Sequence, residues 1–215
     1  MLKLKKSYII VSTMFFTSFA LVSELQSPYN SIKILPLNVW GWFGLQNQKH
    51  IEKIIAETKP KKAVEVGTWL GLSALFIAKR LPSDAILFCI DPWVPYKDME
   101  NMPECQEPLK TAYEQFLSNC IHNGLTHKII PMRMTSMEAA KTFEADIDFI
   151  YLDGSHDEDD VYDDLMEWYP RLSPTGRMCG DDIGWPSVQR AIERVKKTYN
   201  FTVHADDNFW WIERN

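Results

Sequence analysis

Apolar and polar positions follow one another along the chain in blocks that predict alternating strands and helices. Short, nearly continuous apolar runs predict buried strands at residues 63–66, 85–90, 128–132, 147–152 and 177–180. Apolar residues spaced three and four apart predict helices at about 51–58, 73–80, 111–119, 157–168 and 186–195. Strands that alternate with helices indicate a mostly parallel sheet covered on both faces.

The last part of the chain has a different pattern. Two apolar runs, residues 201–205 and 209–212, flank Asp206-Asp207-Asn208 and predict a hairpin. With the preceding strands, this predicts an α/β fold: a Rossmann-like, doubly wound sheet of seven strands, mostly parallel, with an antiparallel strand in the C-terminal hairpin. Residues 94–108 contain three prolines and predict a loop or lid, whereas residues 174–176 predict a turn.

The first 23 residues differ from the rest. Three lysines precede an apolar stretch that ends near Val22, and residues 18–20 have the small-x-small form of a cleavage site. This layout is typical of a secretory signal peptide, because the run is short for a membrane span. A membrane anchor through residues 7–23 and a wrongly assigned start codon are the alternatives. We expect residues 24–45 to form a linker and N-terminal cap, and residues 46–215 to form the main domain.

Composition and net charge exclude only a few classes of function. The 215 residues are 46% hydrophobic and 24% charged, as in an ordinary globular domain. Their net charge of -6 argues against nucleic acid as the main partner, since phosphate binding needs clustered Lys and Arg. The four cysteines lack metal-type spacing, although Cys105 and Cys120 could pair in an oxidising compartment. A homo-oligomer is compatible with all of this.

Acidic residues lie at the ends of several predicted strands. Glu65 is followed by Gly67 and Gly71, and later strands end at Asp91, at Asp153 and at Asp181-Asp182. Open parallel sheets bind ligands beyond the carboxyl ends of their strands. The two glycines would let the backbone approach a ligand closely, although a tight turn without a ligand is an alternative. The loop lacks the central glycine of the dinucleotide fingerprint G-x-G-x-x-G.

The segment from Glu65 to Ser73, EVGTWLGLS, resembles the first motif of class I S-adenosylmethionine-dependent methyltransferases. The chain is most similar to their metal-dependent O-methyltransferase branch, which includes catechol, caffeoyl-CoA and macrocin-type enzymes. The likeness extends from about residue 46 to residue 213 and makes residues 46–215 the expected methyltransferase domain. It implies cofactor-binding positions at Glu65, Gly67, Trp69, Gly71, Ser73, Asp91, Ser136 and Asp153. Within this set Asp91 would hold the ribose, Ser136 would lie on the adenine side, and Glu65 would support the loop.

The same resemblance implies a divalent metal at Asp153, Asp181 and Asp182. Three converging carboxylates repel one another, and a hard dication such as Mg²⁺ relieves that repulsion. The alternative is that Asp181 and Asp182 only shape the turn before the helix that begins near Pro186. Asp182 differs from the asparagine that catechol-type enzymes more often carry at this position. The chain is in this respect more similar to the branch that acts on sugar hydroxyls.

His156 is the candidate general base, with Asp153 as the second catalytic residue. It lies three residues after Asp153, where catechol-type enzymes carry lysine and some macrolide-sugar enzymes carry histidine. Histidine takes up protons near neutral pH. The alternative is a turn histidine that is hydrogen-bonded locally.

These residues lead to one functional hypothesis and several rivals. The hypothesis is S-adenosylmethionine-dependent, Mg²⁺-assisted methylation of a hydroxyl on a small molecule or sugar. The rivals are a metal-independent methyltransferase, a non-catalytic protein that binds the cofactor, and an iron hydroxylase of the same fold. The hydroxylase is disfavoured because the sequence lacks a second well-placed histidine. Since the cofactor is made in the cytosol, a cytoplasmic location is the alternative to export or membrane anchoring.

Overall fold

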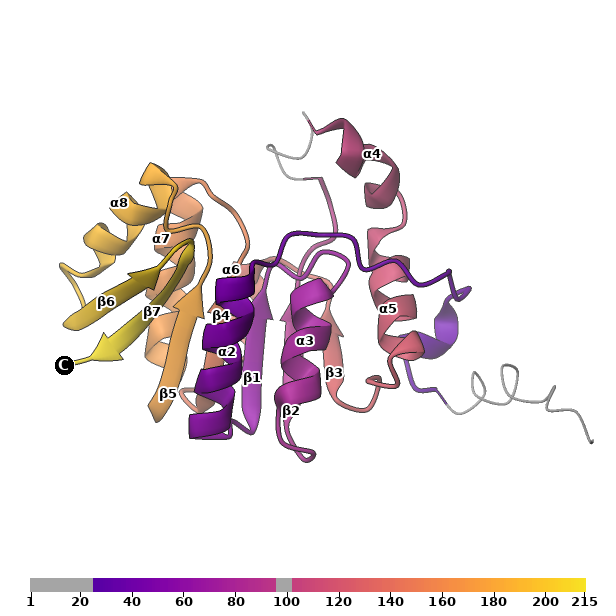
Figure 1. Ribbon diagram of the computed structural model, residues 1–215, viewed down its shortest axis with the longest axis horizontal. Helices are drawn as coiled ribbons and strands as arrows, with labels where there is room; N and C mark the ends of the chain where they lie inside the picture. Colours follow the sequence, from indigo (N-terminus) through magenta and orange to yellow (C-terminus); the bar gives the residue numbers. More distant parts are fainter. Residues whose placement is uncertain (1–24, 96–101) are drawn as a thin grey trace, which may run out of the picture.

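The computed structural model describes residues 25–95 and 102–215, which form one sheet with helices on both faces (Figure 1). The expected signal peptide or anchor at residues 1–23 lies outside the described residues. Within the described ranges, the helices are all too short or too polar to cross a bilayer.

The sheet has seven strands in the order β3-β2-β1-β4-β5-β7-β6. The strands are β1 (Lys62–Val66), β2 (Ile86–Ile90), β3 (Ile129–Met132), β4 (Ile147–Leu152), β5 (Leu172–Gly180), β6 (Phe201–Asp206) and β7 (Phe209–Arg214). The first five pair in parallel, whereas β7 runs antiparallel to both β5 and β6. This confirms the predicted fold class.

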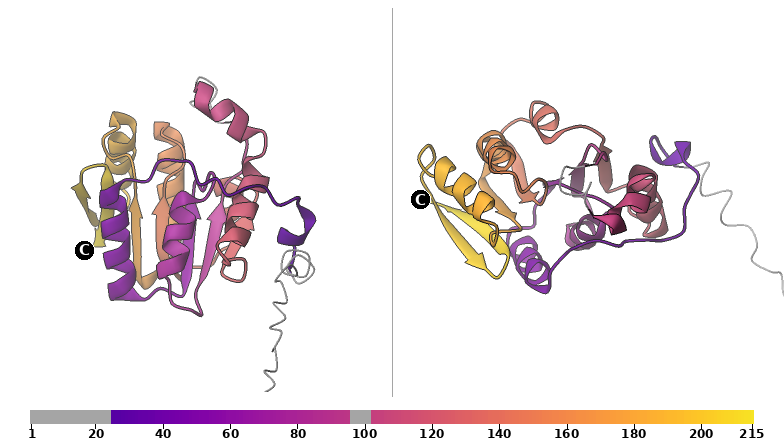
Figure 2. Two further views of the ribbon diagram at one scale, coloured as in Figure 1. Left: turned by 45° about the vertical axis from the view of Figure 1, so that its right-hand side comes forward. Right: turned by 90° about the horizontal axis from the view of Figure 1, so that it is seen from above.

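Helices cover the sheet in two layers, which the view from above separates (Figure 2). The helices are α2 (Leu45–Thr58), α3 (Leu72–Arg80), α4 (Pro103–Leu109), α5 (Ala112–His122), α6 (Ser136–Ala140), α7 (Glu158–Trp168) and α8 (Pro186–Val195). The described residues also include two short 3-10 helices, η1 (Tyr29–Ser31) and η3 (Tyr169–Arg171). One core cluster joins the sheet to α2, α3 and α5, and the other joins it to α6, α7 and α8. Strand β4 contributes side chains to both clusters. Phe149 and Tyr151 pack in the cluster with α2, α3 and α5, whereas Ile150 and Leu152 pack in the cluster with α6, α7 and α8.

Two local predictions were wrong, and the possible pairing of two cysteines is not found. Residues 103–108 of the expected loop belong to α4, in which Pro103 occupies the first turn and Pro108 the last. The expected turn at 174–176 lies inside β5, where an irregularity in the pairing with β4 absorbs the extra residues. All four cysteines are free, so Cys105 and Cys120 do not pair.

The segment before α2 runs along the carboxyl edge of the sheet (Figure 1). Its backbone is tied to α5: the N–H of Leu35 donates to the Ser118 hydroxyl, and the N–H of Asn38 donates to Asn119. Asn119 in turn donates to the carbonyls of Asn38 and Leu70. The expected cap is therefore fixed against the loop that follows β1.

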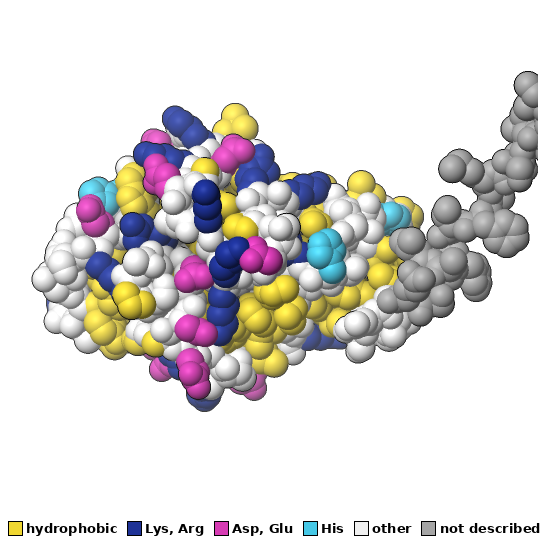
Figure 3. Space-filling view, turned by 90° about the horizontal axis from the view of Figure 1, so that it is seen from below, with side chains coloured by type: hydrophobic (Ala, Val, Ile, Leu, Met, Phe, Trp, Pro, Cys, Tyr) yellow, Lys and Arg dark blue, Asp and Glu magenta, His cyan; other side chains and the backbone are white. Residues whose placement is uncertain are grey.

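The opposite edge of the molecule, where the parallel strands begin, carries interspersed charges (Figure 3). Lys61 and Lys62, at the start of β1, pair with Asp84 and Asp146. The reversal of strand order between β1 and β4 lies at the other end of these strands, where open sheets bind ligands.

Candidate active site

A cleft of about 470 Å³ opens beyond the carboxyl ends of β1, β2, β4 and β5. Most of the predicted site residues line it: Gly67, Trp69, Ser73, Asp91, Asp153, His156, Asp181 and Asp182. Trp42 and Phe43 of the N-terminal cap form part of its wall, as do Met102 before α4 and Trp185 before α8. Acidic residues from three strand ends, those of β2, β4 and β5, therefore meet in one cavity with aromatic sides.

The loop after β1 lies directly against the end of β4. Gly67 has φ of +84°, and a Cβ there would lie 1.9 Å from the carbonyl oxygen of Asp153. Only glycine fits both the backbone conformation and this approach. Gly71 also has positive φ, and a Cβ there would meet the ring of Phe116 at 2.7 Å. Gly71 thus shapes the turn into α3 and does not itself line the cleft.

Asp91 organises the same loop. Its Oδ2 accepts hydrogen bonds from the backbone N–H groups of Thr68 at 3.1 Å and Trp69 at 2.9 Å. Its Oδ1 accepts from the N–H of Trp93 at 2.6 Å. Burial raises the pKa of Asp91, while these three donors favour its ionised form. Asp91 lines the cleft, and its contact with a ribose stays a prediction.

Glu65 lies below the loop and is fully buried. One carboxyl oxygen accepts from the Thr68 hydroxyl at 3.0 Å, and the other has no hydrogen-bond partner among the described residues. Burial raises the pKa of Glu65 to about 7. Its position suits the supporting role that the sequence suggested, and it does not line the cleft.

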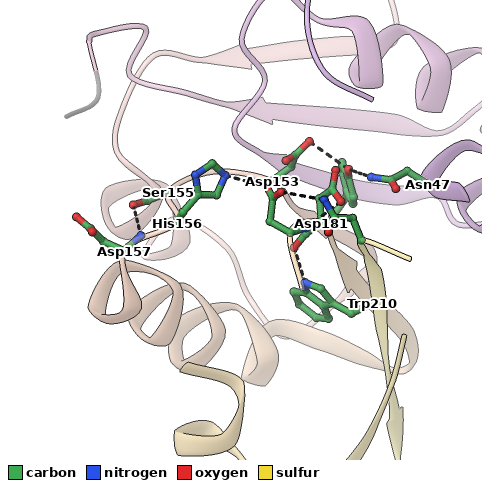
Figure 4. A network of polar contacts seen from close by, with 10 residues as sticks. Asn47, Asp153, Ser155, His156, Asp157, Asp181 and Trp210 are labelled. Carbon is green, nitrogen blue, oxygen red and sulfur yellow. Dashed lines mark hydrogen bonds and ion pairs between the residues drawn. The ribbon is translucent and has the colours of Figure 1, made fainter. Parts of the chain in front are cut away.

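Asp153, Asp181 and Asp182 form a compact acidic cluster on the cleft wall (Figure 4). One carboxylate oxygen from each residue lies within 4.8 Å of those of the other two. Burial and the neighbouring carboxylates raise the pKa of Asp153 well above its usual range. Burial likewise raises the pKa of Asp181 to about 6. In the absence of a cation, the cluster is therefore electrostatically strained.

Neighbouring side chains hold the cluster in place (Figure 4). Asn47 donates to the Tyr151 hydroxyl at 3.0 Å, and that hydroxyl donates to Asp153 at 3.1 Å. Trp210 donates to the backbone carbonyl of Asp181 at 2.8 Å. The sequence did not reveal the roles of Asn47 and Tyr151, because Tyr151 looked like a core residue and Asn47 like an ordinary helix position.

His156 lies at the edge of the acidic cluster. Its Nε2 is 2.8 Å from Oδ2 of Asp182, so the two groups share a hydrogen bond. The imidazole ring stacks on Trp185, with 4.8 Å between centroids and an interplanar angle of 11°. Since Trp185 is 48% exposed, this stacked pair faces the mouth of the cleft.

Ser136, the remaining predicted residue, lies in a second cavity of about 210 Å³ beside the first. It begins α6, and Thr135 before it caps that helix. The Ser136 hydroxyl donates to Asp164, and Trp168 donates to Ser136 at 2.8 Å. Burial raises the pKa of Asp164 to about 7. The sequence gave no signal for Asp164, because α7 is acidic along most of its length.

The sheet topology, the glycine loop after β1 and the acid after β2 define the class of protein: a class I methyltransferase. A family model described as a methyltransferase domain matches residues 64–183, which is more than half of the chain. The chain therefore belongs to this family of S-adenosylmethionine-dependent methyltransferases, as its first motif predicted.

Solved structures share the fold at low sequence identity. TomG, an O-methyltransferase from Streptomyces achromogenes solved with SAM, is 14% identical with a TM-score of 0.62, over 80% of each chain. An O-methyltransferase from Bacillus cereus, in complex with SAH, is 12% identical with a TM-score of 0.57, over 93% of this chain and 92% of that one. A methyltransferase from Geobacter sulfurreducens is 15% identical with a TM-score of 0.57, over 79% and 78%. A search among curated protein sequences gave no match.

Proposed function

We propose that this protein methylates a hydroxyl group of a small molecule, with S-adenosylmethionine as donor and a divalent cation held by Asp153, Asp181 and Asp182. The observation that carries the proposal is the acidic cluster on the wall of the same cleft that the glycine loop borders. The O-methyltransferases among the structural neighbours support the choice of a hydroxyl acceptor.

The acidic cluster suits a hard dication such as Mg²⁺. Its three oxygens lie within 4.8 Å of one another, and carboxylate oxygen is the ligand type that Mg²⁺ prefers. Burial, and after it the neighbouring carboxylates, raise the pKa values of Asp153 and Asp181, and a bound cation would relieve both effects. When bound, the cation would lower the pKa of an acceptor hydroxyl and thereby favour its ionised form.

The glycine loop and its neighbours suit the donor. Gly67 and Trp69 line the cleft beside the acidic cluster, and the indole Nε1 of Trp69 is a buried donor without a partner among the described residues. An acceptor atom on the methionine part of the donor would satisfy it. S-Adenosylmethionine, when bound, supplies a methyl group that is attached to a positively charged sulfur. After transfer of the methyl group, the rest of the donor leaves as a neutral thioether.

His156 would take the proton of the acceptor hydroxyl. Its Nε2 donates to Asp182, so the proton would be taken at Nδ1, and the ring is held flat against Trp185. Asp182 orients the imidazole and stabilises its protonated form through the 2.8 Å contact. The remaining rate gain would come from alignment of acceptor and donor between the loop and the cluster.

The charge of the cleft restricts the acceptor. Among the described residues, its lining contains no Lys or Arg but seven aspartates: Asp91, Asp153, Asp157, Asp160, Asp181, Asp182 and Asp207. A nucleic acid, an acyl-CoA thioester or a sugar phosphate would meet an excess of like charge there, even with a cation bound. The half-exposed Trp42 and Trp185 offer flat apolar surfaces. A neutral or cationic hydroxyl compound with an aromatic or sugar ring fits these properties.

The His156–Asp182 contact also favours a second candidate, in which the same transfer proceeds without a cation. Asp182 would then serve only to orient the base. Thermal-shift measurements with S-adenosylhomocysteine and Mg²⁺, separately and together, distinguish the two. The metal-assisted proposal predicts that the pair stabilises the protein more than either alone, and that Asp153→Ala abolishes the Mg²⁺ contribution. A shift from S-adenosylhomocysteine that Mg²⁺ leaves unchanged would favour the metal-independent enzyme.

A further inference from the structure

Each carboxylate of the acidic cluster already uses one of its two oxygens to accept a hydrogen bond from the protein. Oδ2 of Asp153 accepts from the Tyr151 hydroxyl at 3.1 Å. Oδ1 of Asp181 accepts from the backbone N–H of Asp182 at 2.8 Å. Oδ2 of Asp182 accepts from Nε2 of His156, also at 2.8 Å. The protein therefore engages one side of each carboxylate.

The remaining oxygens are the ones that a cation could reach. Oδ1 of Asp153 accepts no hydrogen bond from the described residues, and Asp153 lines the cleft. Oδ1 of Asp182 has a longer contact, 3.4 Å, with the exposed side chain of Asn208. One oxygen from each of the three aspartates lies within 4.8 Å of the other two. The cluster thus presents single oxygens, and not carboxylates that are free to bind through both.

The Tyr151 hydroxyl is fixed as a hydrogen-bond donor to Asp153. Tyr151 is fully buried, and the buried amide of Asn47 donates to its oxygen at 3.0 Å. Because Asn47 supplies a hydrogen to the phenol oxygen, the hydrogen of the phenol is directed to Asp153 (Figure 4). A phenol keeps this hydrogen at neutral pH. Oδ2 of Asp153 is therefore withheld from a cation.

Small and large divalent cations use carboxylates in different ways. Mg²⁺ requires nearly octahedral geometry at about 2.0–2.1 Å and keeps several waters. Ca²⁺ takes about six to eight oxygens at about 2.3–2.6 Å and often binds a carboxylate through both oxygens. A site that offers one oxygen from each carboxylate suits Mg²⁺, with room for water or an acceptor hydroxyl. The same site gives Ca²⁺ too few ligands.

We propose that Tyr151 determines which cation the acidic cluster selects: its hydroxyl restricts Asp153 to one oxygen and thereby favours Mg²⁺ over Ca²⁺. This inference rests on the proposed function, since it assumes that the cluster holds a cation. Tyr151 acts through Asp153 and is a positioning residue. Its replacement by phenylalanine keeps the ring, removes the donor and frees Oδ2, so that Asp153 can bind Ca²⁺ through both oxygens.

Competition for Mn²⁺ binding, followed by the electron paramagnetic resonance of free Mn²⁺, measures both affinities in one assay. We expect Mg²⁺ to displace Mn²⁺ from the wild-type protein at lower concentrations than Ca²⁺ does. In Tyr151→Phe the ratio of Ca²⁺ affinity to Mg²⁺ affinity should rise roughly 10-fold, as for other residues that hold a metal ligand. A general loss of stability would weaken both cations and leave this ratio unchanged.

Tyr29→Phe is the matched control. It removes another buried phenol hydroxyl, which donates to the backbone carbonyl of Ile129 at 2.8 Å and is remote from the cleft. This variant also loses one buried hydrogen bond, so its stability should fall by a similar amount. It should retain the wild-type ratio of the two affinities.

Infrared spectroscopy of the wild-type protein provides a second test that needs no variant. The separation between the antisymmetric and symmetric carboxylate stretches is larger when a cation binds one oxygen than when it binds both. The difference spectrum on addition of Mg²⁺ should show the larger separation. A separation typical of binding through both oxygens would overturn the inference, and this measurement decides if Tyr151→Phe does not fold.

The other outcomes separate this inference from the function on which it rests. An unchanged ratio in Tyr151→Phe, or a wild-type protein that prefers Ca²⁺, would overturn the role of Tyr151 and leave the proposed function intact. Failure of the wild-type protein to bind Mn²⁺, or equal binding by Asp153→Ala, would overturn the proposed metal site and the inference together.

Discussion

Replacement of Asp181 by asparagine should stabilise the metal-free protein while removing its response to Mg²⁺. The substitution keeps the shape of the side chain and removes one of three carboxylates whose oxygens lie within 4.8 Å of one another. It therefore distinguishes a cluster built to hold a cation from one that stabilises the fold by itself. If Asp181 stabilised the fold by itself, its replacement by asparagine would instead make the metal-free protein less stable.

The magnitude follows from the raised pKa of Asp181. Burial and Asp182 raise it from 3.8 to about 6, which at about 1.4 kcal/mol per pKa unit corresponds to roughly 3 kcal/mol. Because Asp181 is partly exposed, solvent screening reduces this to about 1–2 kcal/mol. The ionised form of Asp181 is disfavoured in the folded state. The resulting loss of stability is therefore complete above pH 6 and vanishes near pH 4.

Urea unfolding of the wild-type and Asp181→Asn proteins at pH 8 and pH 4.5, in EDTA, measures this difference. We expect the variant to be more stable by about 1–2 kcal/mol at pH 8 and nearly equal to the wild type at pH 4.5. With saturating Mg²⁺ the wild type should gain stability and the variant should not. Asp163→Asn controls for loss of an exposed charge. A variant that is less stable at pH 8, or that gains as much from Mg²⁺, would refute the reasoning.

Three further predictions concern the loop and the base. Gly67→Ala should lower the free energy of unfolding in urea titrations by roughly 2–5 kcal/mol, because the added Cβ would lie 1.9 Å from a backbone oxygen. The control is Gly124→Ala, which is also at positive φ but has open space around it. Its free energy of unfolding should fall by only about 1 kcal/mol. His156→Ala should lower kcat roughly 100- to 10,000-fold while calorimetry finds unchanged S-adenosylhomocysteine binding; unchanged turnover would exclude the base role. Burial of Glu65 predicts that the wild type loses stability in urea as pH rises from about 4.5 to about 7, because Glu65 must ionise while buried. Glu65→Gln should weaken this loss; an identical pH profile would contradict the reasoning.

The sheet could be predicted from the sequence because its parallel strands are buried on both faces. Such strands are nearly continuous apolar runs, and residues 147–152 coincide with β4. Helices α4 and α6 were missed for a related reason. Each has five to seven residues and buries few side chains, so neither has room for a helical pattern.

The acids of the site were also predictable, but their partners were not. Asp153 and Asp181 follow adjacent parallel strands, and the ends of such strands meet at one edge. Tyr151 points from β4 to Asp153, although its place in an apolar run indicates only burial. Asp164 pairs with Ser136 across 28 positions, a contact that depends on how α6 and α7 pack. Contacts of this kind are set by tertiary packing and leave no local pattern.

Crystals grown with Mn²⁺ and S-adenosylhomocysteine test most directly whether the donor and the cation share one cleft. The account predicts an anomalous difference peak coordinated by oxygens of Asp153, Asp181 and Asp182, beside the bound thioether. S-Adenosylhomocysteine bound in the cleft without a metal peak at those carboxylates, or with the peak elsewhere, would contradict it.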